Sequence, residues 1–209
     1  MILEKRLLSI LFNIFAHKYF RFLLNNYYSL ITMNKLDKGY IQIYTGNGKG
    51  KSTAAIGQAV RAAGYGLKTY IAQFMKEYPY HELESLKHLS EWITIEQFAG
   101  DDFVYRKEMP NVVEMDKARR GLEKAKSKML NGKYDLIILD EILVSIHFGL
   151  FNDEEVLTFM KMKPDNVELI LTGRYCPDNI IEAADLVTEM KVIKHYYQEG
   201  ILARKGIES

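Results

Sequence analysis

A glycine-rich stretch with two lysines, YTGNGKGKSTAA at residues 44–55, is the part of the chain best suited to chemistry. It follows the apolar run YIQI and precedes an alanine-rich segment, so we expect a strand, a tight turn and a helix in that order. Backbone N–H groups of such a turn, the helix N-terminus and the charge of Lys51 would together hold phosphate, and Ser52 would offer its hydroxyl to Mg²⁺. The predicted phosphate loop comprises Gly46, Asn47, Gly48, Lys49, Gly50, Lys51, Ser52 and Thr53.

The loop departs from the usual phosphate-loop pattern at one position. That pattern is G-x-x-x-x-G-K-[ST], and Thr45 stands at its first glycine position, with the glycine one residue late at Gly46. The alternative is a glycine-rich turn that binds nothing. The preceding strand, the following helix and the Lys-Ser pair favour the phosphate loop over that alternative.

Two acids close a second apolar run, LIILDE, at residues 136–141. Solvated acids at the end of a buried strand would be the ordinary explanation of such a run taken alone. Beside a phosphate loop, Asp140 or Glu141 would instead hold Mg²⁺, directly or through water. Arg174, which follows the run LILTG, is expected to meet phosphate, with a surface ion pair as the alternative.

Strand patterns and helix patterns alternate after Met33, and every motif above follows a strand. Strands are expected at residues 40–45, 68–75, 92–98, 134–141, 167–173 and 186–193. Helices are expected at residues 51–63 and 113–130, after a capping box of Asn152 and Glu155, and in PDNIIEAA at 177–184. The longest irregular parts are expected at residues 76–81 and 99–111. Continuous apolar strands separated by helices predict an α/β fold, a three-layer sandwich with a mainly parallel sheet of the P-loop NTPase (RecA-like) architecture.

Composition limits the classes of partner. The 209 residues include 28 Lys plus Arg and 27 Asp plus Glu, a net charge of +1, which gives no electrostatic case for nucleic acid. The single cysteine, Cys176, excludes an internal disulfide framework and a cysteine-cluster metal site, and suits a cytoplasmic location.

Residues 1–38 differ from the rest and are expected to form an extension to a domain at 39–209. The apolar run LLSILFNIFA at residues 7–16 is too short to span a membrane, so no stable membrane insertion is expected. Three alternatives remain for this segment. The first is an amphipathic helix that lies on the domain or on a membrane surface. The second is a helix that covers a ligand. The third is that the segment is not translated, because Met33 is the true start.

Four stretches together resemble the ATP:corrinoid adenosyltransferases of cobalamin biosynthesis and salvage, the P-loop type that acts on cob(I)yrinic acid a,c-diamide. They are the segment from GYIQIYTGNGKGKSTAA to YIAQFMK, then DLIILDEI, LILTGRYCPDNIIEAADLVTEM and IKHYYQEGILARKGIE. The resemblance is ordered from end to end over residues 39–208. The displaced glycine of the loop and the ending are both typical of that family.

The resemblance implies a reaction and its participants. A corrinoid reduced to Co(I) attacks C5′ of the ribose of ATP, held in a reversed orientation, and inorganic triphosphate leaves. Lys51, Lys49, Arg174, the loop amides and Mg²⁺ would stabilise the leaving charge. The resemblance also implies a homodimer, and reduction by an external reductase or flavodoxin-like electron donor, since the sequence has no flavin or iron–sulfur motif.

The family also places aromatic residues against the lower face of the corrinoid, after the third strand. Phe103 and Tyr105 in DDFVYRKE stand at the matching place, although the family carries tryptophan at the second position. Both would be catalytic together with Lys51; the alternative is ordinary packing under a long loop. His195 is expected in packing or a polar contact, Cys176 as a buried apolar group, and Glu77, His81 and Glu82 beside the site.

Other classes of function remain possible from the residues alone. An ATPase or kinase of the same fold would release ADP and phosphate, with Glu141 activating water. A regulatory nucleotide-binding module would bind ATP without turnover, and a membrane-associated protein would be argued only from residues 1–32.

Overall fold

The computed structural model describes residues 18, 35–76, 80–98, 100 and 107–208. The chain divides into two units, residues 1–34 and 35–209, and Lys18 alone is described in the first unit. The apolar run at 7–16 therefore lies outside the described residues.

The second unit is built on a six-stranded, all-parallel sheet in the order β3-β2-β4-β5-β1-β6. Strand β5 separates the strand before the phosphate loop, β1, from the strand that ends in Asp140, β4. All residues of β2 and β4 are buried, as continuous apolar runs in a doubly covered sheet require. The strands are β1 (Ile41–Thr45), β2 (Thr69–Phe74), β3 (Ile93–Phe98), β4 (Leu136–Asp140), β5 (Glu168–Thr172) and β6 (Leu186–Glu189).

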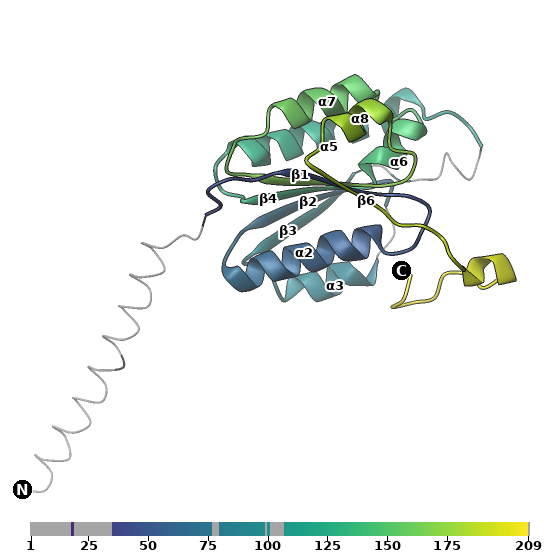
Figure 1. Ribbon diagram of the computed structural model, residues 1–209, viewed down its shortest axis with the longest axis horizontal. Coiled ribbons are helices and arrows are strands. Elements are labelled where there is room, and N and C mark those ends of the chain that lie inside the picture. The colour runs from purple at the N-terminus through teal and green to yellow at the C-terminus, as the bar shows by residue number, and fades with distance from the viewer. Residues whose placement is uncertain (1–17, 19–34, 77–79, 99, 101–106, 209) are drawn as a thin grey trace, which may run out of the picture. The chain divides into compact units, whose positions relative to one another are not determined.

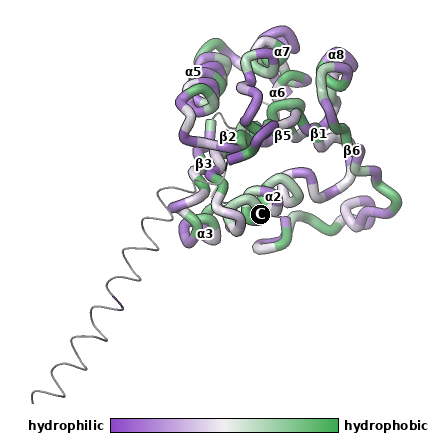
Figure 2. The backbone as a smooth tube through the Cα atoms, turned by 60° about the vertical axis from the view of Figure 1, so that its left-hand side comes forward, coloured by the Kyte–Doolittle hydropathy of each residue, from purple (hydrophilic) through white to green (hydrophobic). Residues whose placement is uncertain are grey.

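Helices cover both faces of this sheet. Helices α2 and α3 lie on one face and α5, α6, α7 and α8 on the other, and a turned view shows the same three layers (Figures 1 and 2). Each interlayer space is filled by its own cluster of buried apolar side chains. The helices are α2 (Lys51–Tyr65), α3 (His81–Lys87), α5 (Val112–Leu130), α6 (Ile142–His147), α7 (Asp153–Lys161), α8 (Asp178–Glu182) and the 3₁₀ turn η1 (Tyr196–Glu199).

The predicted fold class is confirmed, and so is the order of the predicted elements. The predicted capping box before α7 is present: Asn152 Oδ1 accepts from the Glu155 N–H at 2.8 Å, and Glu155 Oε2 accepts from the Asn152 N–H at 2.9 Å. The last strand was predicted too long. It ends at Glu189 because its partner β1 ends at Thr45, after which the chain turns onto the phosphate loop.

Candidate active site

A cavity of about 1180 Å³ lies where the carboxyl ends of the strands meet. The phosphate loop, residues that follow β2, β4 and β5, and the segment after β6 all contribute to its wall. The sheet order brings these pieces together, because parallel strands end at a common edge. Of the predicted site residues, Asn47, Gly48, Lys49, Gly50, Lys51, Ser52, Thr53, Glu141 and Arg174 line the cavity.

The phosphate loop joins β1 to α2 as predicted. Gly50 has φ +117° and carries no side chain that could cap α2, so the positive end of this helix is presented to the cavity. Lys51 is buried, and its Nζ donates to the carbonyl of Gly48 at 2.8 Å. Burial lowers the pKa of Lys51, which the negative charge of Glu141 partly offsets. The side chain of Lys51 thus folds back onto the loop with which it would bind phosphate.

Two glycines of the loop serve a purpose that the sequence did not reveal. A Cβ atom at Gly46 or Gly48 would lie 2.6 Å from the carbonyl oxygen of Met190. The Gly48 N–H donates to that same oxygen at 2.6 Å. These positions therefore require glycine for contact with the segment after β6, and the Gly48 amide is already hydrogen-bonded.

Asp140 is fully buried and its two oxygens both accept hydrogen bonds. Oδ1 accepts from Thr172 Oγ1 at 2.7 Å, and Oδ2 accepts from Lys76 Nζ at 2.7 Å and from Gln73 Nε2 at 3.2 Å. Burial by itself would raise the pKa of Asp140. The charge of Lys76 and the hydrogen bonds outweigh burial and hold this pKa below its ordinary value. Asp140 is thus an ionised carboxylate whose partners lie within the protein.

Glu141 faces the cavity, unlike its neighbour. Its backbone has φ +61°, and its N–H donates to Thr172 Oγ1 at 2.9 Å, which turns the chain out of β4. Burial raises the pKa of Glu141, and the charge of Asp140 raises it further, while nearby cations only partly oppose this. Such a carboxylate gains from a bound cation.

Backbone strain gathers at this cavity. Four described residues other than glycine have positive φ, and three of them, Met75, Glu141 and Tyr175, line the cavity. Left-handed conformations of bulky residues are unfavourable and tend to persist at functional sites. Tyr175 stacks on His147 with ring centroids 4.0 Å apart.

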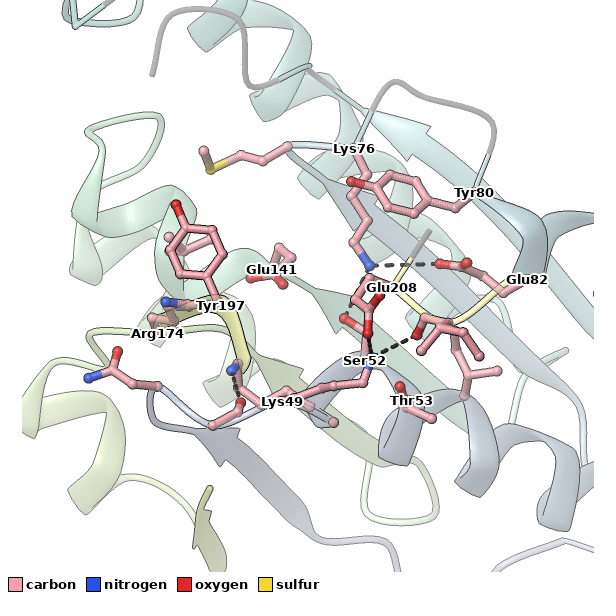
Figure 3. Close-up of a pocket in the computed structure, with 18 of the residues that line it drawn as sticks. Lys49, Ser52, Thr53, Lys76, Tyr80, Glu82, Glu141, Arg174, Tyr197 and Glu208 are labelled. Atoms are coloured by element: carbon pink, nitrogen blue, oxygen red, sulfur yellow. Dashed lines mark hydrogen bonds and ion pairs between the residues drawn. The ribbon is translucent and has the colours of Figure 1, made fainter. Parts of the chain in front are cut away.

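Lys76 is a site residue that the sequence analysis did not single out. Its side chain points from the end of β2 toward Ser52, with Glu82 of α3 close by (Figure 3). Lys76 Nζ donates to Ser52 Oγ at 3.1 Å and lies 3.8 Å from Glu82 Oε1. A lysine directly after an apolar strand is the sequence signal that would have marked it.

The remaining predicted residues fall into three groups. His81 and Glu82 line the cavity from α3, and His195 lines it from the segment after β6, where its Nδ1 accepts from the Tyr197 N–H at 3.1 Å. Cys176 is half-buried, and burial raises the pKa of its thiol to about 12, which agrees with an unreactive role. Three predicted residues lie outside the described residues: Glu77, Phe103 and Tyr105.

Among the residues that the structure describes, no group of three or more His, Cys, Asp or Glu side chains is arranged to hold a metal ion. Within the same residues, no helix combines the length and apolar character that crossing a membrane requires.

Comparison with known proteins gives consistent matches. The family model described as ATP:corrinoid adenosyltransferase BtuR/CobO/CobP matches residues 37–209. A corrinoid adenosyltransferase from Sinorhizobium sp is 35% identical, covering 82% of this chain and 81% of that protein. One from Escherichia coli (strain K12) is 34% identical, covering 82% and 86%. A solved KaiC-like protein from Pyrococcus horikoshii OT3 matches 76% of this chain and 75% of its own at 20% identity, with a TM-score of 0.47.

Proposed function

Because the chain belongs to the ATP:corrinoid adenosyltransferase family, we propose that it moves the 5′-deoxyadenosyl group of ATP to the Co(I) centre of a reduced corrinoid. The reaction belongs to cobalamin biosynthesis or salvage. The observation that carries this proposal is the cavity of about 1180 Å³ floored by the phosphate loop. Pockets for one small ligand usually measure roughly 300–1,000 Å³, so this cavity suits a nucleotide together with part of a second substrate.

The loop would hold the triphosphate while the reaction takes place at carbon. The electron pair of Co(I) forms a Co–C bond with C5′, the C5′–O bond breaks, and triphosphate leaves with the electrons of that bond. Negative charge therefore grows on the polyphosphate, where Lys51, Lys49 and Arg174 surround it with positive charge. The attacking atom is a metal centre, so the transfer requires no general base.

The oxygen donors beside the loop fit Mg²⁺, which prefers few protein oxygens and completes its shell with water and phosphate. Both oxygens of Asp140 are already engaged by protein donors, whereas Glu141 lines the cavity. We therefore assign Glu141 and Ser52 to direct contact and Asp140 to support through Lys76, which bonds Ser52 as well. When bound, Mg²⁺ would neutralise charge on the polyphosphate.

Three further parts of the proposal come from the family. Phe103 and Tyr105 would pack against the lower face of the corrinoid, and an external reductase or flavodoxin-like protein would supply electrons. A homodimer is proposed as well, supported by apolar surface along β6: every residue of this edge strand is exposed, and Ile193 beyond it is 94% exposed. We propose a cytoplasmic location, which would keep the single thiol of Cys176 reduced.

Product analysis tests the proposed reaction. The full chain is incubated with ATP and Mg²⁺, with and without Co(I)-corrinoid, and phosphate products are separated while the cobalt spectrum is followed. We expect adenosylcorrinoid and intact tripolyphosphate in equal amounts, formed only when corrinoid is present. ADP with orthophosphate as the products would indicate an ATPase or kinase instead.

Lys51→Ala is the matched variant for this experiment. Removing its charge should lower kcat/KM by at least about 10²-fold, the loss typical of a group that stabilises developing charge. Lys161→Ala, on the exposed end of α7, removes the same charge away from the cavity and should leave the rate unchanged.

A further inference from the structure

The segment after β6 lies against the phosphate loop at two places. Met190 accepts the hydrogen bond from the Gly48 N–H, and the end of the chain returns to the loop at Ile207 and Glu208. Both views place the last described residues of the chain near α2, the helix that follows the loop (Figures 1 and 2). Residues between these two contacts, among them Tyr197, line the cavity. Residues of the segment 190–208 therefore form part of the cavity wall.

Glu208 makes hydrogen bonds to other residues of the same segment. Its Oε2 accepts from the Arg204 N–H at 2.8 Å and from Arg204 Nε at 3.3 Å, while Oε1 accepts from Arg204 Nη2 at 3.2 Å and from the Tyr196 hydroxyl. The Arg204 guanidinium also lies 4.9 Å from the centre of the Tyr196 ring. These hydrogen bonds lower the pKa of Glu208, so its carboxylate is ionised at neutral pH.

The same carboxylate pairs with a lysine of the phosphate loop. Lys49 Nζ lies 3.2 Å from Glu208 Oε1 and donates to the carbonyl of Ile207 at 2.7 Å. The side chains of Lys49 and Glu208 are 41% and 17% exposed, so solvent reaches this pair. The carboxylate of Glu208 thus pairs with Lys49, one of the cations that the loop would offer to polyphosphate.

We propose that Glu208 competes with bound polyphosphate for Lys49 and thereby weakens the hold of the loop on its triphosphate product. This inference rests on the proposed function, because it concerns the leaving group of that reaction. A loop with several cations would otherwise retain a highly charged product tightly. When the carboxylate of Glu208 pairs with Lys49 again, the affinity of the loop for triphosphate falls. Because the pair is partly exposed, breaking it to bind phosphate costs little free energy.

Isothermal titration of tripolyphosphate into the full chain, without cobalt or turnover, tests the competition. Glu208→Gln keeps the shape of the side chain and removes its charge. It should bind tripolyphosphate about two- to five-fold more tightly than the wild type, the range expected for a partly exposed ion pair. Glu199→Gln is the matched control, since Glu199 lies in the same segment, pairs with Lys194 at 3.6 Å and is absent from the cavity wall; it should change affinity little.

A second background separates competition from anchoring. In a Lys49→Met chain, Glu208→Gln should give no gain, because the contested cation is gone. If Glu208 merely anchors the segment, Glu208→Gln would weaken binding in both backgrounds, and an unchanged affinity in the wild-type background would equally overturn the proposal. An equal gain of tripolyphosphate affinity in Glu199→Gln would show that net charge alone explains the change, and would overturn the proposal as well. Failure of the wild type to bind tripolyphosphate would instead count against the proposed function.

Discussion

Lys76 brings a positive charge beside Asp140, and both side chains are largely buried. The side chains of this pair are 10% and 1% exposed, and the two charged atoms lie 2.7 Å apart. Burial would lower the pKa of Lys76, but the charge of Asp140 and the hydrogen bond between them raise it above its ordinary value. Each group is therefore charged because of the other, and the pair should respond as a unit to substitution.

Lys76→Met is predicted to destabilise the fold by about 3–5 kcal/mol, because it leaves the carboxylate of Asp140 buried without its cation. The double variant Lys76→Met, Asp140→Asn removes both charges and should recover a large part of that loss. Chemical denaturation of the two variants and the wild type measures the difference. A single variant no less stable than the double variant would contradict a coupled pair.

Individual site residues differed in how far the sequence could reveal them. Residues next to each other in the chain, such as those of the phosphate loop, and acids that end an apolar strand were recognisable from local pattern. Lys76 and Glu208 were not, because their roles depend on partners 64 and 159 positions away, Asp140 and Lys49. The direction in which Asp140 and Glu141 point was also beyond the sequence, since it depends on the left-handed backbone at Glu141.

Helix α5 lies close to strand β3 at one glycine. A Cβ atom at Gly121 would come within 2.5 Å of Phe98 Cγ and 2.7 Å of Phe98 Cβ, and the position of Cβ is fixed by the backbone of β3. Gly121→Ala is therefore predicted to cost a net of about 1–2 kcal/mol, since overpacking outweighs the gain in helix propensity. Thermal and chemical unfolding of the variant measure this loss.

Gly57→Ala is the matched control within α2. Apart from its chain neighbours and the backbone of its own helix, nothing lies within 4 Å of the Cβ position at Gly57, so alanine should stabilise the chain by up to about 1 kcal/mol through helix propensity alone. The two substitutions are chemically identical, yet they should change the free energy of unfolding in opposite directions. The same sign for both would show that packing of α5 on β3 does not decide the effect.

The helices that the sequence analysis missed share a physical feature. α3 has no side-chain cap at Tyr80, and α6 follows Glu141, an N-cap residue in a left-handed conformation that makes no side-chain cap, so neither helix carries the usual start signal. Both are also shorter than two and a half turns, too short for a helical period to stand out. By contrast, Asn152 and Asn111 each open a helix with a complete capping box, and the first of these was predicted.

Charge in the whole chain is nearly balanced, so the gathering of cationic side chains beside the phosphate loop is a local arrangement. The net charge is +1, yet Lys49, Lys51, Lys76 and Arg174 all line one cavity. Long-range attraction of a polyanion would need an excess of positive charge over the surface. Binding of ATP should therefore depend on these few side chains rather than on the field of the whole molecule.

We propose that residues 39–209 form a domain that folds without the preceding extension. Both clusters of buried apolar residues described above, with their partly buried neighbours, are built from residues 36–184. A chain that begins at Met33 keeps all of these side chains. It is therefore predicted to unfold within about 2 °C of the full chain, a difference of less than about 1 kcal/mol.

Calorimetry of the full and shortened chains checks this prediction, and adenosyl transfer and binding to anionic vesicles, measured on both chains, separate the explanations of the extension. Full activity in the shortened chain would mean that residues 1–32 neither cover a ligand nor support the site. A loss of activity at unchanged stability would favour a segment that covers a substrate, whereas loss of binding to anionic vesicles alone would favour a membrane-surface helix. A fall of many degrees in the unfolding temperature would contradict an independent domain, because it would require the extension to bury apolar surface of the core.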